Sequence, residues 1–211
     1  MRRVTWRDRI RQFWHFVVRP HATIALGTLV IVGFAAGIIF WGGFNWSMEM
    51  TNNQEFCISC HEMERNVFRE FRETSHYSNR TGVRATCPDC HVPKNWFHKV
   101  VRKIQATGEL YYHLIGSINT RERFEAERVR LATRVWRTMK ETDSRECRNC
   151  HNYDFMDYTL QEARASRRHQ QGIDEGQTCI DCHKGIAHTL PDEAFEAWTA
   201  LQAQLNAEAA R

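Results

Sequence analysis

The sequence predicts a mainly α-helical protein, with a single N-terminal transmembrane helix followed by a loop-rich helical domain. Two observations support this fold class. Residues 22–44 contain no charged side chain, and about 20 apolar residues are enough to cross a bilayer as a helix. Farther along the chain, apolar residues recur at helical spacing, whereas alternating strand patterns are scarce.

The segment ahead of the apolar run is basic. Residues 1–21 hold six arginines and one aspartate, a net charge of +5, with aromatic side chains between them. This composition predicts an amphipathic segment on the cytoplasmic surface of the membrane. The arginine excess also predicts that the chain beyond residue 46 lies in the periplasm, with the protein in the inner membrane of a Gram-negative cell.

A cleaved signal peptide is the alternative interpretation of residues 22–44. The apolar region of a signal peptide usually has about 7–15 residues, and this run is longer. We therefore expect an uncleaved anchor helix that contacts membrane lipid.

Three later segments show the helical pattern, with apolar residues every three or four positions. They are Lys94–Ile115, Arg121–Thr142 and residues 192–209. We expect a periplasmic domain over residues 47–191, followed by a C-terminal helix or tail over residues 192–211.

All eight cysteines belong to four copies of Cys-x-x-Cys-His, the attachment signal for a c-type haem. The pairs are Cys57 and Cys60, Cys87 and Cys90, Cys147 and Cys150, and Cys179 and Cys182. The two thiols of a pair can each bond one vinyl group of a porphyrin, and the histidine that follows can bind its iron. These histidines are His61, His91, His151 and His183. The motifs predict a multihaem cytochrome c domain with four covalently bound haem c groups, whose core is largely porphyrin.

Zinc is the competing interpretation, because Cys-x-x-Cys pairs also build tetrahedral zinc sites. Four copies, each followed directly by histidine, favour haem, and a disulfide framework suits smaller secreted chains. The first two motifs start 30 residues apart and the last two 32 apart, with 60 between the pairs. This spacing suggests two two-haem modules.

Five further histidines follow the apolar run, and most of them are expected to be distal ligands. They are His76, His98, His113, His169 and His188. His188 lies only five residues after His183, so it cannot easily reach the opposite face of the same haem. We expect it to serve a different haem.

The formal net charge of +4, from 29 basic and 25 acidic residues, gives no reason to infer a nucleic-acid partner, and we expect none. Many of the arginines are expected to face solvent or to pair with haem propionates.

The order of basic segment, apolar span and four haem motifs resembles the NapC/NirT family of membrane-anchored tetrahaem cytochromes, which includes the small subunit of cytochrome c nitrite reductase. The resemblance runs from about residue 5 to 191, and its specific stretches are CISCHEM, TSHYSNRTGVRATCPDCHVP, VRKIQATGEL, KETDSRECRNCHNY and TCIDCHKGIAH. It implies that the protein oxidises membrane quinol and passes electrons to a periplasmic terminal reductase.

The resemblance also implies a set of axial ligands. It assigns Met63 to the first iron in place of His61, and Lys103 to the second iron. It assigns His76 to the fourth iron and His188 to the third. His98 could replace Lys103, and His169 is a further distal candidate.

The same resemblance implies a quinol pocket beside the first haem. Glu109 is the carboxylate expected there, acting as a base for the protons that haem cannot accept, and Lys103 is the other residue expected at the reaction site. A solvated helix carboxylate is the alternative role of Glu109.

Periplasmic nitrate reductase is the partner that the resemblance favours. Nitrite, trimethylamine N-oxide and dimethyl sulfoxide reductases are the alternatives. A passive relay without a quinol site and a reductase of nitrite or hydroxylamine also stay open, so an enzymatic role is undecided. Only ten residues separate Trp46 from Cys57, which favours direct quinol oxidation.

Overall fold

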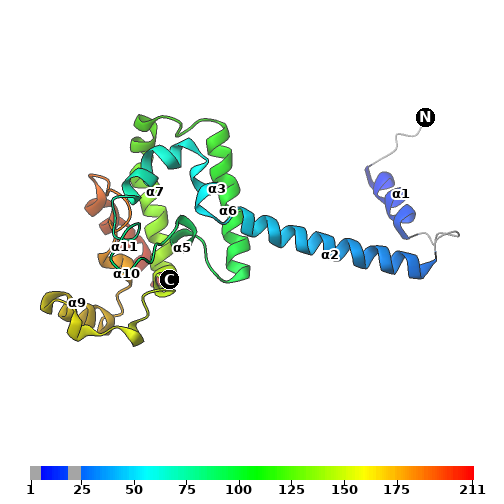
Figure 1. Ribbon diagram of the computed structural model, residues 1–211. Coiled ribbons are helices and arrows are strands. Elements are labelled where there is room, and N and C mark those ends of the chain that lie inside the picture. The colour runs from blue at the N-terminus through cyan, green and yellow to red at the C-terminus, as the bar shows by residue number, and fades with distance from the viewer. Residues whose placement is uncertain (1–5, 19–24) are drawn as a thin grey trace. The chain divides into compact units, whose positions relative to one another are not determined.

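The computed structural model describes residues 6–18 and 25–211 and divides the chain into two compact units, residues 1–47 and 48–211. Within the described residues every regular element is a helix and no strand occurs (Figure 1). The mainly α-helical fold class is therefore confirmed.

The first unit consists of α1 (Trp6–Val18) and most of α2 (Leu26–Met50). Helix α1 exposes apolar side chains such as Trp6, Phe13 and Trp14 between its charged residues. In the described part of the chain, α2 is the one helix long and apolar enough to span a membrane. The parts of the expected segments that fall on residues 1–5 and 19–24 lie outside the described residues.

Helix α2 continues to Met50, past the expected end of the apolar run at residue 44. The sequence between these positions contains no proline, and the side-chain amide of Asn45 donates to the Trp41 carbonyl 2.8 Å away. The backbone can therefore extend as a helix beyond the apolar segment.

Three longer helices, several short ones and irregular loops make up the second unit. In chain order these are α3 (Gln54–Ile58), η1, a π-helix (Met63–Phe68), α4 (Arg69–Phe71), α5 (Cys87–His91), α6 (Trp96–Leu114), α7 (Arg121–Glu141), α8 (Arg145–Arg148), the 3-10 helices η2 (Tyr153–Phe155) and η3 (Tyr158–Leu160), α9 (Ala163–Asp174), α10 (Cys179–Cys182) and α11 (Ala194–Ala209). Helices α6, α7 and α11 begin and end within two residues of the segments expected from the sequence.

Side-chain caps determine where the two long helices of this unit begin. The Asn95 side chain accepts from the backbone N–H groups of Phe97 and His98 at the start of α6. The Thr120 hydroxyl accepts from the Arg123 N–H at the start of α7. These bonds satisfy N–H groups that have no partner inside the helix.

The apolar core of the second unit is small. One cluster forms where α7 packs against α10 and α11, and it contains Trp136, Ile180, Trp198 and Leu201. Across the described residues, only seven large apolar side chains are buried. A domain of this length normally has a much larger core, and porphyrin groups held by the four motifs would supply the missing apolar volume.

A strained turn joins α7 to α8 and brings the third and fourth motifs together. Asp143 and Ser144 both adopt left-handed backbone conformations, with φ of 53° and 48°, which are uncommon for residues other than glycine. Ser144 is fully buried, and its hydroxyl accepts from the backbone N–H of Ile180 at 3.1 Å. The strained backbone therefore lies at the point where the Ser144 side chain links the third motif to the fourth.

Ser144→Ala should lower the free energy of unfolding by about 1–3 kcal/mol, because the buried Ile180 N–H loses its acceptor. Guanidinium unfolding of the full-length protein in detergent, followed by haem absorbance, measures this change. Ser78→Ala, at an exposed serine, is the control and should change little. Equal unfolding midpoints for the two variants would show that the Ser144 hydroxyl does not stabilise the turn.

Candidate functional site

Each haem motif lies on or beside a short helix with its own local support. Helices α5 and α10 each begin after a threonine, Thr86 or Thr178, whose N–H donates to an aspartate three residues later. These bonds measure 2.9 Å to Asp89 and 2.6 Å to Asp181. The reciprocal capping box is visible in the sequence as Thr-Cys-x-Asp, and it orients both cysteines of the motif on one helical turn.

The motifs form a continuous series in space. Helix α5, with the second motif, packs against both α3 and α8, which hold cysteines of the first and third motifs. The thiols of Cys57 and Cys87 lie close enough to interact, and so do those of Cys147 and Cys179. Motifs one and two therefore meet, motifs three and four meet, and the second and third connect the two pairs.

Every motif histidine has a second histidine ring opposite it. The ring-centroid distances are 6.0 Å for His61 and His113, 6.2 Å for His91 and His188, 6.1 Å for His151 and His76, and 6.0 Å for His183 and His169. Rings stacked face to face would lie closer together than this. Each pair leaves a gap between two potential metal ligands.

This gap has the size that one iron atom requires. Two metal–nitrogen bonds of about 2.0 Å and two ring radii of roughly 1.1 Å place ring centroids about 6.2 Å apart when two histidines bind one metal. The residues present therefore fit a haem iron with two histidine ligands at each motif. We propose that all four haems are held in this way.

The protonation of the buried histidines agrees with a ligand role, because only neutral imidazole binds metal. Desolvation and the neighbouring His188 lower the pKa of His91 to about 4. Desolvation also lowers the pKa of His76 and of His188. The Nδ1 atoms of His76 and His188 are buried without a hydrogen-bond partner among the described residues.

The structure places His76 opposite His151 of the third motif and His188 opposite His91 of the second. The family resemblance implied the fourth iron for His76 and the third for His188. His188 lies opposite a motif other than the one it follows, as we expected from its short separation from His183. These partners are decided by long-range packing, which spacing along the chain does not reveal.

The ligand roles of Met63 and Lys103 stay predictions. Met63, expected to replace His61 as a ligand, begins the π-helix η1 two residues after it, and the ring of His113 lies opposite His61. The Lys103 amine donates to the Thr51 carbonyl at 2.5 Å and to its hydroxyl at 3.1 Å, and desolvation lowers its pKa. The Nδ1 atom of His98, the suggested replacement for Lys103, lies 2.9 Å from the Asn95 side-chain oxygen.

The sequence left His113 unassigned and offered His169 only as a further candidate. The number of histidines was the signal that the sequence offered. Five histidines outside the motifs follow the span, and each of the four motifs needs one distal ligand. The side-chain partners of these two rings also point to ligand roles. His169 Nδ1 lies 2.6 Å from the Gln161 side-chain oxygen, and His113 Nδ1 lies 2.8 Å from Glu62 Oε1.

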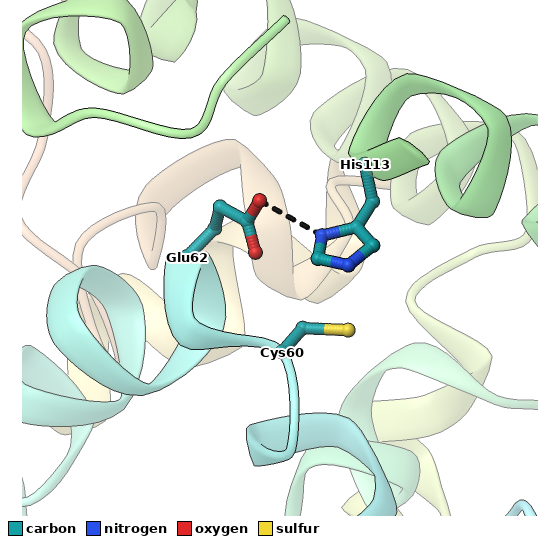
Figure 2. A group of neighbouring side chains, drawn as sticks. All are labelled: Cys60, Glu62 and His113. Atoms are coloured by element: carbon teal, nitrogen blue, oxygen red, sulfur yellow. Dashed lines mark hydrogen bonds and ion pairs between the residues drawn. The ribbon is translucent and has the colours of Figure 1, made fainter. Parts of the chain in front are cut away.

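Glu62 is the buried acidic residue of the first motif. Its side chain is 2% exposed, and Figure 2 shows it directed at the His113 ring, with the Cys60 thiol below. The carboxylate holds the His113 ring at Nδ1 and leaves its Nε2 available to a metal, while the same oxygen lies 3.5 Å from His61 Nε2. Cys60, Glu62 and His113 also satisfy the distances of a small metal cluster, but the thiol belongs to the haem motif, so we assign the group to the first haem.

An ion-pair clamp holds the chain beside His188. Arg128 on α7 donates to both carboxylate oxygens of Glu70 on α4, at 2.7 and 3.1 Å. Glu70 accepts from the Thr189 N–H at 2.9 Å, and Arg128 donates to the Thr189 carbonyl at 3.1 Å. The backbone N–H and carbonyl of Thr189, the residue after His188, are thus both bound by the Arg128–Glu70 pair. Glu125 accepts further bonds from Arg128.

Glu109, the expected base, lies on α6 with its side chain 56% exposed. Arg102, two turns earlier on the same helix, donates to it at 2.7 Å. Arg102 also donates to the His91 carbonyl at 3.3 Å, and His113 follows one turn after Glu109. Helix α6 therefore carries a carboxylate, its arginine partner and a distal ligand.

Comparison with known proteins identifies the family. The model of the NapC/NirT cytochrome c family, N-terminal region, matches residues 19–193. The chain belongs to this family. It is 54% identical to cytochrome c-type protein NapC of Escherichia coli (strain K12) over 183 residues, which cover 87% of this chain and 91% of that protein. It is 56% identical to denitrification system component NirT of Stutzerimonas stutzeri over 178 residues, 84% of this chain and 89% of that protein.

A third relative is cytochrome c-type protein TorC of Escherichia coli (strain K12), 43% identical over 184 residues, which cover 87% of this chain and 47% of that protein. No solved structure matches the chain. Family membership and the apolar helix α2 make the protein a membrane-anchored c-type cytochrome of respiratory electron transport, with covalently bound haem.

The ligand assignment predicts the effect of removing one distal histidine. His113→Leu should convert one of the four low-spin haems into a form that binds carbon monoxide when reduced, because one axial position becomes open. Met63→Leu and Lys103→Leu should leave all four haems low-spin. Electron paramagnetic resonance and carbon monoxide difference spectra measure both effects. A changed haem in Met63→Leu, with four unchanged haems in His113→Leu, would favour methionine ligation.

The clamp predicts a local effect on the haem served by His91 and His188. Glu70→Gln should weaken the bonds to Arg128 and Thr189 and destabilise the fold by about 1–3 kcal/mol. It should also shift the resonance of a single haem, because the chain next to His188 loses its support. Glu73→Gln, at an exposed glutamate in the same segment, is the control. Equal shifts in all four resonances would indicate a general loss of stability and no positioning role.

Proposed function

We propose that this cytochrome oxidises quinol from the inner membrane and passes the electrons to a periplasmic terminal reductase, with nitrate reductase as the favoured partner. The observation that carries this proposal is the unbroken series of four histidine pairs. The first pair includes His61, in the motif that starts only ten residues after Trp46. A redox chain that begins so close to a membrane span is positioned to accept electrons from a lipid-soluble donor.

Bound haem c supplies one-electron redox chemistry, and the chain provides the groups that hold and separate the four haems. The eight cysteine thiols would form the covalent attachments, and eight histidines face one another in pairs. Because neighbouring motifs pack directly against each other, four bound haems would be held in a compact series. Lys103 is engaged by Thr51, so we assign it to positioning α6.

Quinol oxidation releases two protons, which haem does not accept. Glu109 is the proposed acceptor, since it is solvent-accessible and lies on the helix that carries His113. Arg102 holds the carboxylate in place at 2.7 Å, and an ionised carboxylate can take a hydroxyl proton as a general base. The exposed side of Glu109 then allows the proton to leave to solvent.

The proposal also includes the identity of the terminal reductase and the orientation of the protein in the membrane. Several relatives are named NapC and one is named NirT, a denitrification system component, which supports nitrate reductase ahead of nitrite, trimethylamine N-oxide or dimethyl sulfoxide reductase. The basic segment before the span supports a cytoplasmic N-terminus and a periplasmic haem domain. A reporter that functions only in the periplasm, fused after Arg211, tests the orientation.

Glu109→Gln should slow quinol-dependent haem reduction in proteoliposomes by about 10²–10⁴-fold, the usual contribution of a general base. Reduction by dithionite should be unchanged, because it needs no proton acceptor from the protein. Glu141→Gln is a matched control, since Glu141 is 50% exposed and also pairs with an arginine of its own helix. If the wild-type protein is not reduced by quinol but exchanges electrons with soluble redox proteins, it is a passive relay.

A further inference from the structure

Helix α6 presents an apolar face to the outside of the domain. The side chains on this face follow one another at helical spacing. They are Phe97, Val101, Ile104 and Tyr111, which are 66%, 38%, 64% and 59% exposed, and the C-cap residue Ile115, which is 55% exposed. In a helix that only covers a soluble domain, such a face would be turned inward.

The contacts of α6 with the rest of the domain come from polar residues on its other side, which also carries the exposed Leu110. Lys99 binds Glu49 at 2.6 Å and Lys103 binds Thr51 at 2.5 Å. Farther along, His113 binds the buried Glu62 at 2.8 Å. The helix is thus attached by its polar side, which is why its apolar side is left exposed.

Two of these contacts place α6 near the point where the chain leaves the apolar span. Glu49 and Thr51 follow Trp46 by only three and five residues. At about 1.5 Å per helical residue, they lie within roughly 10 Å of the end of the apolar run. A helix that is held by both residues is therefore held close to the membrane surface.

We propose that α6 is an interfacial helix whose apolar face enters the bilayer from which the span emerges. Its occupant is membrane lipid. Exposed Tyr111 and Tyr112 are of the residue types that favour the interface, and amphipathic helices of this kind bury their apolar face by about 5–10 Å. The basic Lys99 and Lys103 lie on the opposite side and tie the helix to the domain.

This docking would give the haem domain a second contact with the membrane besides the anchor. It would also fix the height of His113 and Glu109, which lie on the same helix. A quinol could then approach the first motif without leaving the lipid phase. The inference rests on membrane anchoring and on the exposed face of α6, and it does not require the proposed quinol oxidation.

Photo-crosslinking of the full-length holoprotein in phospholipid nanodiscs tests the docking. The photoreactive residue p-benzoylphenylalanine replaces Phe97 or Ile104 on α6, and Phe195 on α11 or Leu160 as controls. The two control residues are 78% and 85% exposed. Mass spectrometry should find lipid adducts at the two α6 positions and none at the two control positions. Unchanged haem absorbance shows that each variant is folded.

Other products would overturn the proposal. A covalent dimer at positions 97 and 104 would show that a second copy covers the face. Adducts only with an added soluble reductase would show a protein partner, and an absence of lipid adducts would show that the face stays in water. Lipid adduct formation needs no quinol, so a protein that docks but fails to oxidise quinol would contradict only the proposed function.

Discussion

The second unit depends on one constraint. Four pairs of histidine rings are held opposite each other with their centroids about 6 Å apart. Each gap has the width of one iron atom between two nitrogen ligands. Two rings so far apart gain little from each other directly. They are held in place by the chain around them, and the bound group would complete the contact.

Several polar networks provide that support in place of a large apolar core. Arg128 and Glu70 bind both backbone groups of Thr189, next to His188. Ser144 links the start of the third motif to the fourth through Ile180. Such networks have directional geometry, whereas apolar contacts do not, so they suit a domain in which ligand position matters more than compactness.

Helix α6 connects the membrane side of the protein to its redox chemistry. One of its faces carries His113, Lys103 and Lys99, which bind the domain, and the other is apolar and exposed. The same helix carries Glu109 with its partner Arg102. Proton acceptance, ligand position and contact with lipid would all depend on the orientation of this single helix.

The sequence alone determined the features that arise from local patterns. The four Cys-x-x-Cys-His motifs, the apolar span and helices α6, α7 and α11 follow from spacing, hydropathy and the absence of proline. Each depends on residues close together in the chain, and local rules describe such residues well.

Tertiary structure decided which histidine faces which motif. Met63 and Lys103 were suggested by short matching stretches, but His113 and His188 occupy the positions opposite His61 and His91. These partners lie far apart in the sequence, and they meet only because α6 and the chain after the fourth motif fold back onto the first module. No periodicity along the chain encodes such a meeting, since it arises from the packing of whole segments and from contacts such as the Arg128–Glu70 pair.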